Sequence, residues 1–577
     1  MESFLSYLKV IWILLPFAAW VFSNSYSQKR TLHILQLEDY IPSRMLRSSG
    51  KKSLQTLFDL DLIGLVLISI YAYRMVCSAD GTCGCRLVGF YDELGIFFWT
   101  IGCAYRSFSI GRSLKTSKKK LVLTPRARRI YWTGIIISFF IAARLVVIIY
   151  EIGSSKGIPS IIDSELGFLY FHAWILASMF VIERASPLIL SLSVFVLKPV
   201  ESFIQKRYLR DAKRILGEIK PLVIGITGSY GKTGTKEILA AILAEKYNVF
   251  KPPGSYNTLM GVTRIIREKM RPYHEVFVAE MGAYKIGSIN KLCELVNPTH
   301  GIITIIGLQH LERFKTQKAI QQAKGELIRS LPANGLAILN GSDPLCREIG
   351  DAHNGRVIYF YVEKDESDAP VDKASVSARN IHLSPVGSDF TISFTDGEEL
   401  EIHLPLLGRP AIANAVASAA MAEQLGVPKR GIKRALASMP QVQHRLEAKP
   451  GEGGVRIIDD AFNSNPIGAA SALEVLSQAT DGLRILVTPG MVELGEMESE
   501  ANYKFGKQAA VACDLAVLVG VNRVEPIRKG LLDGGFDEEK IWVVSTLNEG
   551  LDKLKGYLQP GDTMLLENDL PDQYDNQ

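Results

Sequence analysis

Residues 222–246 read LVIGITGSYGKTGTKEILAAILAEK, in which a β-branched run, a glycine-rich turn and an amphipathic run follow one another directly. The apolar residues of 222–227 are typical of a strand buried in a parallel sheet. In 236–246 the apolar residues recur at the spacing of one helix face. We therefore expect a strand, a loop and a helix in succession, the unit from which α/β domains are built.

The loop between this strand and helix has the composition of a phosphate-binding turn. Its glycines let backbone N–H groups converge on phosphate oxygens at the positive end of the helix. Lys232 would neutralise phosphate charge, and the Thr233 hydroxyl would bind Mg²⁺. The turn departs from the general P-loop motif, which would have a glycine at the position of Ile226. The predicted nucleotide-binding residues of the loop are Gly228, Ser229, Tyr230, Gly231, Lys232, Thr233, Gly234 and Thr235.

The composition of the whole chain excludes several classes of protein. The chain has 577 residues, of which 47% are hydrophobic and 22% charged, so it is neither one small domain nor disordered. Basic and acidic residues nearly balance, with a net charge of +5, whereas a dedicated nucleic-acid binder has a clear excess of basic residues. No nucleic-acid partner is therefore expected. Seven cysteines exclude a disulfide-built scaffold. The mean hydropathy of +0.13 suggests that part of the chain lies in lipid.

Most long apolar runs lie in the first 200 residues, where a helix that crosses a membrane needs about 20 apolar residues. Five runs are predicted to cross: 4–23, 58–77, 87–105, 130–150 and 166–182. A signal peptide is the competing interpretation of the first run. The run 187–197 is short and flanked by proline, so we expect it to be interfacial or re-entrant, followed by a basic amphipathic connector.

The charges between these runs predict their orientation. Segment 25–56 carries six basic residues against two acidic ones, and segment 106–129 carries nine basic residues and no acid. The positive-inside rule places both segments, and everything after about residue 183, in the cytoplasm. The 106–129 segment is either a topology signal only or a site for anionic lipid headgroups or an anionic lipid-linked substrate. Cys77, Cys83 and Cys85 then share an external loop, and their redox state stays open.

Further motifs follow the phosphate loop in a fixed order. They are SYNT (255–258) with Gly261, VFVAEMG (276–282), ITIIGLQHLERF (303–314), AKGE (323–326), LPANGLAILNGSDP (331–344), IIDDAFNSNP (457–466) and GMVELGE (490–496). Together with the loop, they resemble the Mur ligase family, which makes peptide bonds in cell-wall precursors, and its relative folylpolyglutamate synthase. The last two motifs are most similar to the D-alanyl-D-alanine-adding ligases of the family. The resemblance covers about residues 221–567.

The resemblance implies an ATP-dependent, ADP-forming ligase that activates a carboxylate as an acyl phosphate and joins it to an amine. It implies the catalytic residues Lys232, Lys324, His310 and Arg445, and two Mg²⁺ ions held by Thr233, Glu280, His310 and a carbamylated Lys324. It also implies nucleotide contacts by Asn414, Arg445 and Asp460, and substrate contacts by Asn257, Thr258, Asn463 and Asn465.

These residue types fit that reaction independently of the resemblance. A carboxylate that attacks a triphosphate is repelled by it, so the site needs cations. Mg²⁺ prefers oxygen ligands, which Thr233 and Glu280 offer. An unmodified Lys324 would repel the ion, whereas carbamylation turns its amine into an anionic oxygen ligand. Glu280 ends an expected strand, and ligands bind at that edge of open α/β sheets.

The chain also departs from the family pattern. In 408–414, Pro410 and Ala411 replace a histidine and an asparagine, so the adenine contacts are expected to differ. The segment LLENDLPDQY (565–574) replaces a Lys-Gly-Ser-Arg-like segment near the amine-substrate side, so the amine need not be D-alanyl-D-alanine. The family's N-terminal UDP-sugar domain is replaced by the apolar region.

We therefore predict a multi-span α-helical membrane domain of about five helices (1–200) and a basic amphipathic connector (201–220). An α/β central ATP-binding domain with a P-loop (221–440) and a Rossmann-like C-terminal domain (441–577) follow. The expected location is the cell membrane, with cytoplasmic catalytic domains. The expected partners are membrane lipid, a peptide-bearing cell-wall precursor that is lipid-linked or UDP-linked, and an amino acid or dipeptide amine. Two alternatives stay open: another amide ligase of the polyglutamate or cyanophycin type, and a membrane transporter or receptor with a regulatory ATP-binding domain.

Overall fold

The computed structural model describes residues 2–38, 40–53, 88–116, 120–155, 165–307, 314–363, 375–441, 444–461, 464–492, 494–521 and 523–568. The chain divides into two compact units, residues 1–204 and 205–577. Each unit is described by itself below.

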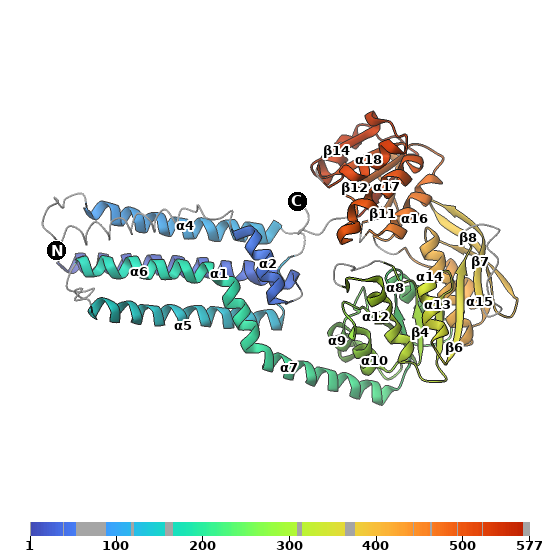
Figure 1. The fold of residues 1–577 in the computed structure, drawn as a ribbon, viewed down its shortest axis with the longest axis horizontal. Helices are drawn as coiled ribbons and strands as arrows, with labels where there is room; N and C mark the ends of the chain where they lie inside the picture. The colour runs from blue at the N-terminus through green and yellow to red at the C-terminus, as the bar shows by residue number, and fades with distance from the viewer. Residues whose placement is uncertain are drawn as a thin grey trace. The chain divides into compact units, whose positions relative to one another are not determined.

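The first unit is built from long helices. They are α1 (Glu2–Leu37), α2 (Pro42–Ser53), α4 (Val88–Thr116), α5 (Pro125–Ser155), α6 (Glu165–Arg184) and α7 (Ser186–Ile219), of which α7 continues into the second unit. Helix α1 packs against α4, α5 and α6, and the four helices run side by side in Figure 1. The unit is therefore a helical bundle centred on α1.

The bundle is apolar outside and partly polar inside. Phe108 and Phe140 are 70% and 75% exposed, and many other large apolar side chains of the bundle are also exposed. In contrast, Glu183 is buried in the interior, where its Oε1 accepts hydrogen bonds from Arg106 Nη1 at 2.6 Å and Ser23 Oγ at 2.8 Å. This distribution is the reverse of that expected for a protein surface in water.

Four of the five apolar runs predicted from the sequence lie within α1, α4, α5 and α6, and the run 58–77 lies outside the described residues. Two predicted segments differ in extent. The segment 106–129, expected to be a loop, is helical up to Thr116 in α4 and again from Pro125 in α5, and Arg106 of α4 pairs with Glu183 inside the bundle. The run 187–197 is part of the continuous helix α7, which passes through Pro199 and does not break there. Among the described residues, α5 and α7 are long and apolar enough to cross a membrane, by length and composition only.

The second unit begins with a nine-stranded sheet of order β2-β3-β1-β4-β5-β6-β7-β8-β9. The pairs from β2 to β7 are parallel, and β8 and β9 add antiparallel strands. The strands are β1 (Leu222–Thr227), β2 (Val249–Phe250), β3 (Val276–Glu280), β4 (His300–Ile303), β5 (Leu336–Asn340), β6 (Arg356–Val362), β7 (Ser375–Ser384), β8 (Gly387–Ser393) and β9 (Glu399–Leu404).

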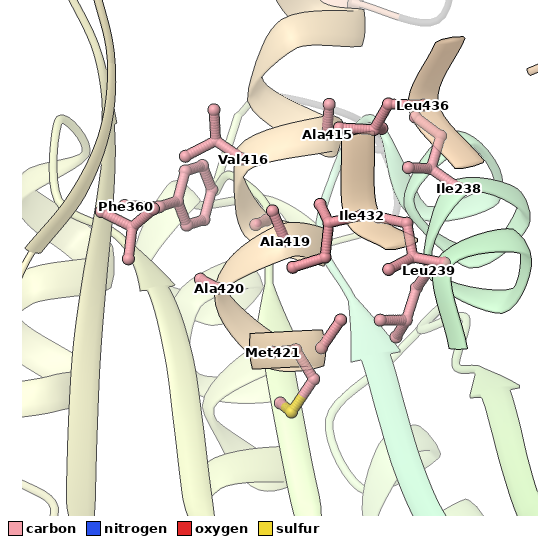
Figure 2. Packing of buried hydrophobic residues seen from close by; sticks show 14 of the residues in the cluster. Ile238, Leu239, Phe360, Ala415, Val416, Ala419, Ala420, Met421, Ile432 and Leu436 are labelled. Atoms are coloured by element: carbon pink, nitrogen blue, oxygen red, sulfur yellow. The ribbon is translucent and has the colours of Figure 1, made fainter. Parts of the chain in front are cut away.

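Helices cover both faces of this sheet. One face packs against α8 (Lys232–Leu243), α14 (Arg409–Gln424) and α15 (Lys429–Ala437). The other packs against α9 (Leu259–Lys269), α10 (Ser288–Val296), α12 (Gln317–Arg329) and α13 (Pro344–Asp351). Figure 2 shows the first layer, where Leu239, Ala419 and Ile432 from the three helices meet and Phe360 lies against Val416. The many alanines of α14 let it approach the sheet and α8 closely.

A second sheet follows, of order β10-β11-β15-β12-β13-β14, in which only β10 is antiparallel among the described strands. Its strands are β10 (Glu447–Pro450), β11 (Arg456–Asp460), β12 (Arg484–Thr488), β13 (Leu515–Val519), β14 (Ile541–Val544) and β15 (Thr563–Glu567). Its helices are α16 (Pro466–Ser477), α17 (Glu498–Ala512), α18 (Glu525–Asp533) and α19 (Leu547–Lys555), with short 3₁₀ turns at Glu452–Gly454, Gly495–Met497 and Glu538–Lys540. Helices α16, α17 and α18 contribute to one core cluster and α19 to another, which is the expected Rossmann-like arrangement.

Candidate active site

The glycine-rich loop lies at the carboxyl end of β1 and leads directly into α8. Gly228 and Gly231 have φ angles of 151° and 81°, a backbone conformation that favours glycine. A Cβ atom at Gly228 would also lie 1.9 Å from Thr304 Oγ1. The loop can therefore take this path only with glycine at these positions, and it leaves the N-terminus of α8 open to an anion.

The loop is held by contacts with Thr304, Gly307 and Asp343, which lie in the sequence motifs but were not predicted as site residues. Ser229 Oγ donates a hydrogen bond to the Gly307 carbonyl at 2.9 Å, and Thr304 Oγ1 donates to the Tyr230 carbonyl. Asp343 Oδ2 accepts from the Ile306 backbone N–H at 2.7 Å. These contacts tie the loop to the segments after β4 and β5. These supporting residues are hard to predict from the sequence, because serine, threonine and aspartate are common at strand ends.

Lys232 is the first residue of α8, as the motif requires. Its Nζ donates to the Gly228 and Ser229 carbonyls, at 2.7 and 2.9 Å. Burial is the main cause that lowers its pKa, Glu280 opposes this effect and Arg445 adds to it, and the resulting pKa is about 8. The side chain is thus held over the loop where a phosphate would bind, at a pKa close to neutral pH.

Glu280 ends β3 and is only 1% exposed. Its carboxylate accepts hydrogen bonds from Asn257 Nδ2 at 2.9 Å and from Lys236 Nζ at 3.3 Å. Lys236 is fully buried and was not among the predicted site residues. The sequence could have indicated this buried charge, because Lys236 follows Thr235 on a face of α8 that is otherwise apolar. The buried carboxylate is therefore fixed by a cation and an amide.

Lys324 lies on α12 and is 4% exposed. Burial lowers its pKa well below the ordinary value, the charge of Lys232 lowers it further, and Cys346 opposes the shift. Within the described ranges, its Nζ makes no hydrogen bond or ion pair. A lysine of lowered pKa is more often the neutral amine, which is the form that reacts with carbon dioxide.

Arg445 and Asp460 come from the C-terminal half of the unit. Arg445 lies between His444 and Leu446, whose φ angles are both positive, and Leu446 N–H donates to Asp460 Oδ1 at 3.1 Å. Burial lowers the pKa of Arg445, an effect that Glu280 and Asp460 oppose. The fold therefore brings Arg445 within electrostatic reach of Glu280, about 165 positions earlier in the sequence.

The other predicted residues have local partners. Thr235 Oγ1 donates to Asn414 Oδ1 at 3.0 Å, so Asn414 of α14 adjoins the loop. Thr258 accepts from Gly261 N–H at the start of α9, and Asn465 accepts from Gly468 N–H at the start of α16. Thr258 and Asn465 thus act as N-caps, a role separate from the predicted substrate contacts. His310 and Asn463 lie outside the described residues.

A cavity of about 940 Å³ adjoins the glycine-rich loop at Tyr230, Gly231 and Gly234. Its polar part includes Tyr230, Asn414, Arg445 and Asp460. Its apolar part includes Phe360, Leu406 and Ile467, among other residues. A phosphate-binding turn and an arginine beside an apolar chamber suit a ligand with a charged phosphate end and a flat apolar end, such as a nucleotide.

The residues present also fit Mg²⁺. Thr233 lies in the first turn of α8, and Glu280 ends the strand next to β1. A hydroxyl and a buried carboxylate are both oxygen donors, which this ion prefers. The carboxylate is held by Asn257 and Lys236 and so has little freedom to turn away. These two residues would hold a Mg²⁺ ion beside the phosphates.

Comparisons with known proteins agree with this geometry. The Mur ligase middle domain matches residues 226–422, and the Mur ligase glutamate ligase domain matches residues 444–567. The UDP-N-acetylmuramoyl-tripeptide–D-alanyl-D-alanine ligase of Escherichia coli (strain K12) is 29% identical over 58% of this chain and 73% of that protein. The protein of the same name from Mycobacterium tuberculosis is 30% identical over 60% of this chain and 70% of that protein.

Solved structures show the same similarity. MurF from Acinetobacter baumannii superposes with a TM-score of 0.56 at 26% identity and covers 64% of this chain and 78% of that chain. The MurF ligase from Thermotoga maritima, solved in complex with ADP, gives a TM-score of 0.55 at 26% identity over 64% of this chain and 81% of that chain. The chain therefore belongs to the Mur ligase family and is an ATP-dependent, ADP-forming ligase.

Proposed function

We propose that this chain is a membrane-anchored Mur-type ligase of cell-wall synthesis. It joins a peptide carboxylate of a lipid-linked precursor to the amine of an amino acid or dipeptide. The observation that carries this proposal is the group of cations, Lys232, Lys236 and Arg445, gathered around the buried Glu280 beside the phosphate-binding turn. An amide ligase needs such a group to bring a carboxylate up to a triphosphate.

The reaction uses the chain's residues in two steps. In the first, a substrate carboxylate oxygen attacks the γ-phosphorus of ATP, ADP leaves, and an acyl phosphate forms. The loop N–H groups, Lys232 and Arg445 bind and orient the phosphates and offset their charge. Mg²⁺ held by Thr233 and Glu280 supplies further charge compensation when bound. In the second step, the incoming amine attacks the acyl carbon, phosphate leaves, and an amide forms.

Lys324 has a separate part in this proposal. Its amine is buried near the charge of Lys232, and its lowered pKa favours the neutral form. A neutral amine adds carbon dioxide to give a carbamate and releases one proton. The carbamate would be anionic, so it would turn the repulsion between Lys232 and Lys324 into attraction and would offer an oxygen ligand to a second Mg²⁺ ion. His310 is proposed as a further ligand on the resemblance alone.

The membrane anchor is supported by the first unit. Its exposed faces are apolar, its interior holds a buried Arg106–Glu183 ion pair, and α5 and α7 have the length and composition of spanning helices. Intramembrane ion pairs face the interior of a bundle for the same energetic reason. We place the unit in the cell membrane in contact with lipid, with about five spans and with the ligase domains in the cytoplasm, where ATP is available.

The proposal of a lipid-linked acceptor is supported by which part of the chain the matches cover. The two domain matches begin at residue 226, so the helical unit lies outside both. The relatives are named for a UDP-linked tripeptide and D-alanyl-D-alanine. A helical unit in the membrane would instead present a lipid-linked acceptor to the ligase. A soluble UDP-linked acceptor is the alternative, with the membrane unit as an anchor only.

The first prediction concerns turnover. The purified full chain in detergent, with Mg-ATP and D-alanyl-D-alanine, is expected to release ADP and form an amide when a lipid-linked muramyl tripeptide is added. Lys232→Ala is expected to lower the rate by about 100-fold or more, because it removes a phosphate-binding charge. The matched control Lys318→Ala changes an exposed lysine of α12 and should keep full activity.

The outcomes separate the acceptors. Faster turnover with the UDP-linked tripeptide would assign the soluble acceptor. Amines other than D-alanyl-D-alanine, such as single D-amino acids, are compared in the same assay. ADP release that is unchanged in Lys232→Ala, or that needs no acceptor, would contradict the proposed ligase reaction.

The second prediction concerns membrane attachment. The full chain is expected to sediment with the membrane fraction and to stay there after alkaline carbonate or high-salt washing, because apolar helix faces are held by lipid rather than by charge. Quantitative blotting of pellet and supernatant measures this. Release of the intact chain by carbonate would contradict an integral membrane unit.

The third prediction concerns pH. Since burial lowers the Lys232 pKa to about 8, the free protein loses this charge as the pH rises through 8. ATP needs the charged lysine, so the Kd for ATP should rise about fivefold between pH 8 and pH 9. Titration calorimetry of the full chain measures it. Lys232→Arg keeps its charge at pH 9 and should flatten the rise, whereas an equal rise in that variant would assign it to another group.

A further inference from the structure

A second carboxyl group lies directly behind Asp460. Asp460 and Glu567 are the last residues of the neighbouring parallel strands β11 and β15, and they are paired in register. Asp460 lines the cavity, whereas Glu567 is 1% exposed and does not line it. Glu567 therefore makes no contact with a ligand in the cavity and can influence it only through Asp460.

The burial of Glu567 beside Asp460 requires a proton on this pair. Glu567 Oε1 accepts from Ser464 Oγ at 2.5 Å. Its Oε2 is buried and receives no hydrogen bond from a donor among the described residues. Glu567 and Asp460 occupy paired positions on adjacent strands, so their two carboxyl groups lie next to each other, and each acts on the charge of the other. Two ionised carboxylates buried side by side would repel each other, so one of them carries a proton, which it can donate to the other.

The surroundings decide which residue holds the proton. Asp460 Oδ1 accepts from Leu446 N–H at 3.1 Å, and Arg445 stabilises its negative charge. The main effects on Glu567 are burial and the nearby Asp460, and both raise its pKa. The pKa of Asp460 is raised to about 6, while that of Glu567 is raised well above its usual range. The proton thus resides on Glu567 and the charge on Asp460.

The backbone around the pair is fixed as well. Asn568 N–H donates to the Asp460 carbonyl at 3.2 Å, and Asn568 Nδ2 donates to the Gly490 carbonyl at 2.6 Å. Asn568 Oδ1 accepts from Ser464 N–H at 3.4 Å. The segment that departs from the family pattern, beginning at 565, therefore binds the strand end that carries Asp460.

We infer that Glu567 is a neutral carboxylic acid that donates its proton to the Asp460 carboxylate and so positions that carboxylate at the cavity to accept hydrogen bonds from the nucleotide. This inference rests on the proposed binding of ATP in the cavity. Glu567 is a positioning residue, because it acts on the nucleotide only through Asp460. A negative Asp460 of fixed orientation suits the donor hydroxyl groups of a ribose.

Substitution by glutamine tests the inference sharply. Glu567→Gln keeps an oxygen that accepts from Ser464 and an N–H that donates to Asp460, but it has no ionisable group. Glu567→Ala removes both. For the full chain in detergent at pH 8, we expect Glu567→Gln to keep the Kd for ATP within about twofold of the unsubstituted chain. Glu567→Ala should raise it about tenfold or more, as expected for losing a hydrogen bond to a charged group.

Infrared difference spectroscopy between the unsubstituted chain and Glu567→Gln gives a second readout that does not depend on nucleotide. It should show a protonated carboxyl band at pH 8 that is lost in the variant. This readout still decides the matter if Glu567→Ala fails to fold. Loss of ATP affinity in Glu567→Gln equal to that in Glu567→Ala, or absence of the band, would overturn the inference. If the unsubstituted chain binds no ATP but shows the band, the proposed function fails while the protonation of Glu567 stands.

Discussion

The charge balance around Glu280 is the constraint on which the site depends. One carboxylate, 1% exposed, faces Lys236 at 3.3 Å and interacts with the charges of Lys232 and Arg445. Cations packed together without an anion would repel one another in a medium of low dielectric constant. Glu280 reduces this repulsion in the empty site, and a triphosphate would do so in the occupied one. The excess of positive charge over one buried carboxylate therefore prepares the site for phosphate.

This balance also links the two sheets of the larger unit. Lys232 and Glu280 belong to the nine-stranded sheet and its helices, while Arg445 and Asp460 belong to the segments that begin the second sheet. Each sheet brings its residues to the carboxyl ends of parallel strands, where ligands bind in open α/β folds. Glu567 lies behind this edge of the second sheet and holds the Asp460 carboxylate that the sheet presents to the cavity.

Much of this could be predicted from the sequence, because the motifs are local. The strand at 222–227, the glycine loop and the helix that follows were confirmed, since glycine chemistry and apolar periodicity act over a few residues. The strand ending at Glu280 and the Rossmann-like arrangement of the C-terminal part were confirmed for the same reason. The family was predicted from the order of these motifs and is confirmed by the domain matches.

The remaining features depend on contacts between distant residues. Lys236 was missed because its partner Glu280 is 44 positions away, and Glu567 was missed because its partner Asp460 is more than 100 positions away. The segment from residue 106 was expected to be a loop because a charge count cannot foresee that α4 extends to Thr116 and that Arg106 pairs with Glu183 in the bundle. The continuity of α7 through Pro199 was missed because proline weakens a helix without always ending it. Local patterns thus identify the phosphate loop, whereas the buried ion and acid pairs require the fold.

The most direct test of the central claim is the fate of the substrate's carboxylate oxygen. The full chain is given ATP, an amine and an acceptor peptide whose reacting carboxylate carries ¹⁸O at both oxygens, and the released phosphate is analysed by mass spectrometry. Activation of the carboxylate as an acyl phosphate predicts one ¹⁸O atom in each phosphate released with an amide product. Amide formation that releases phosphate without the label would contradict the mechanism proposed for the site.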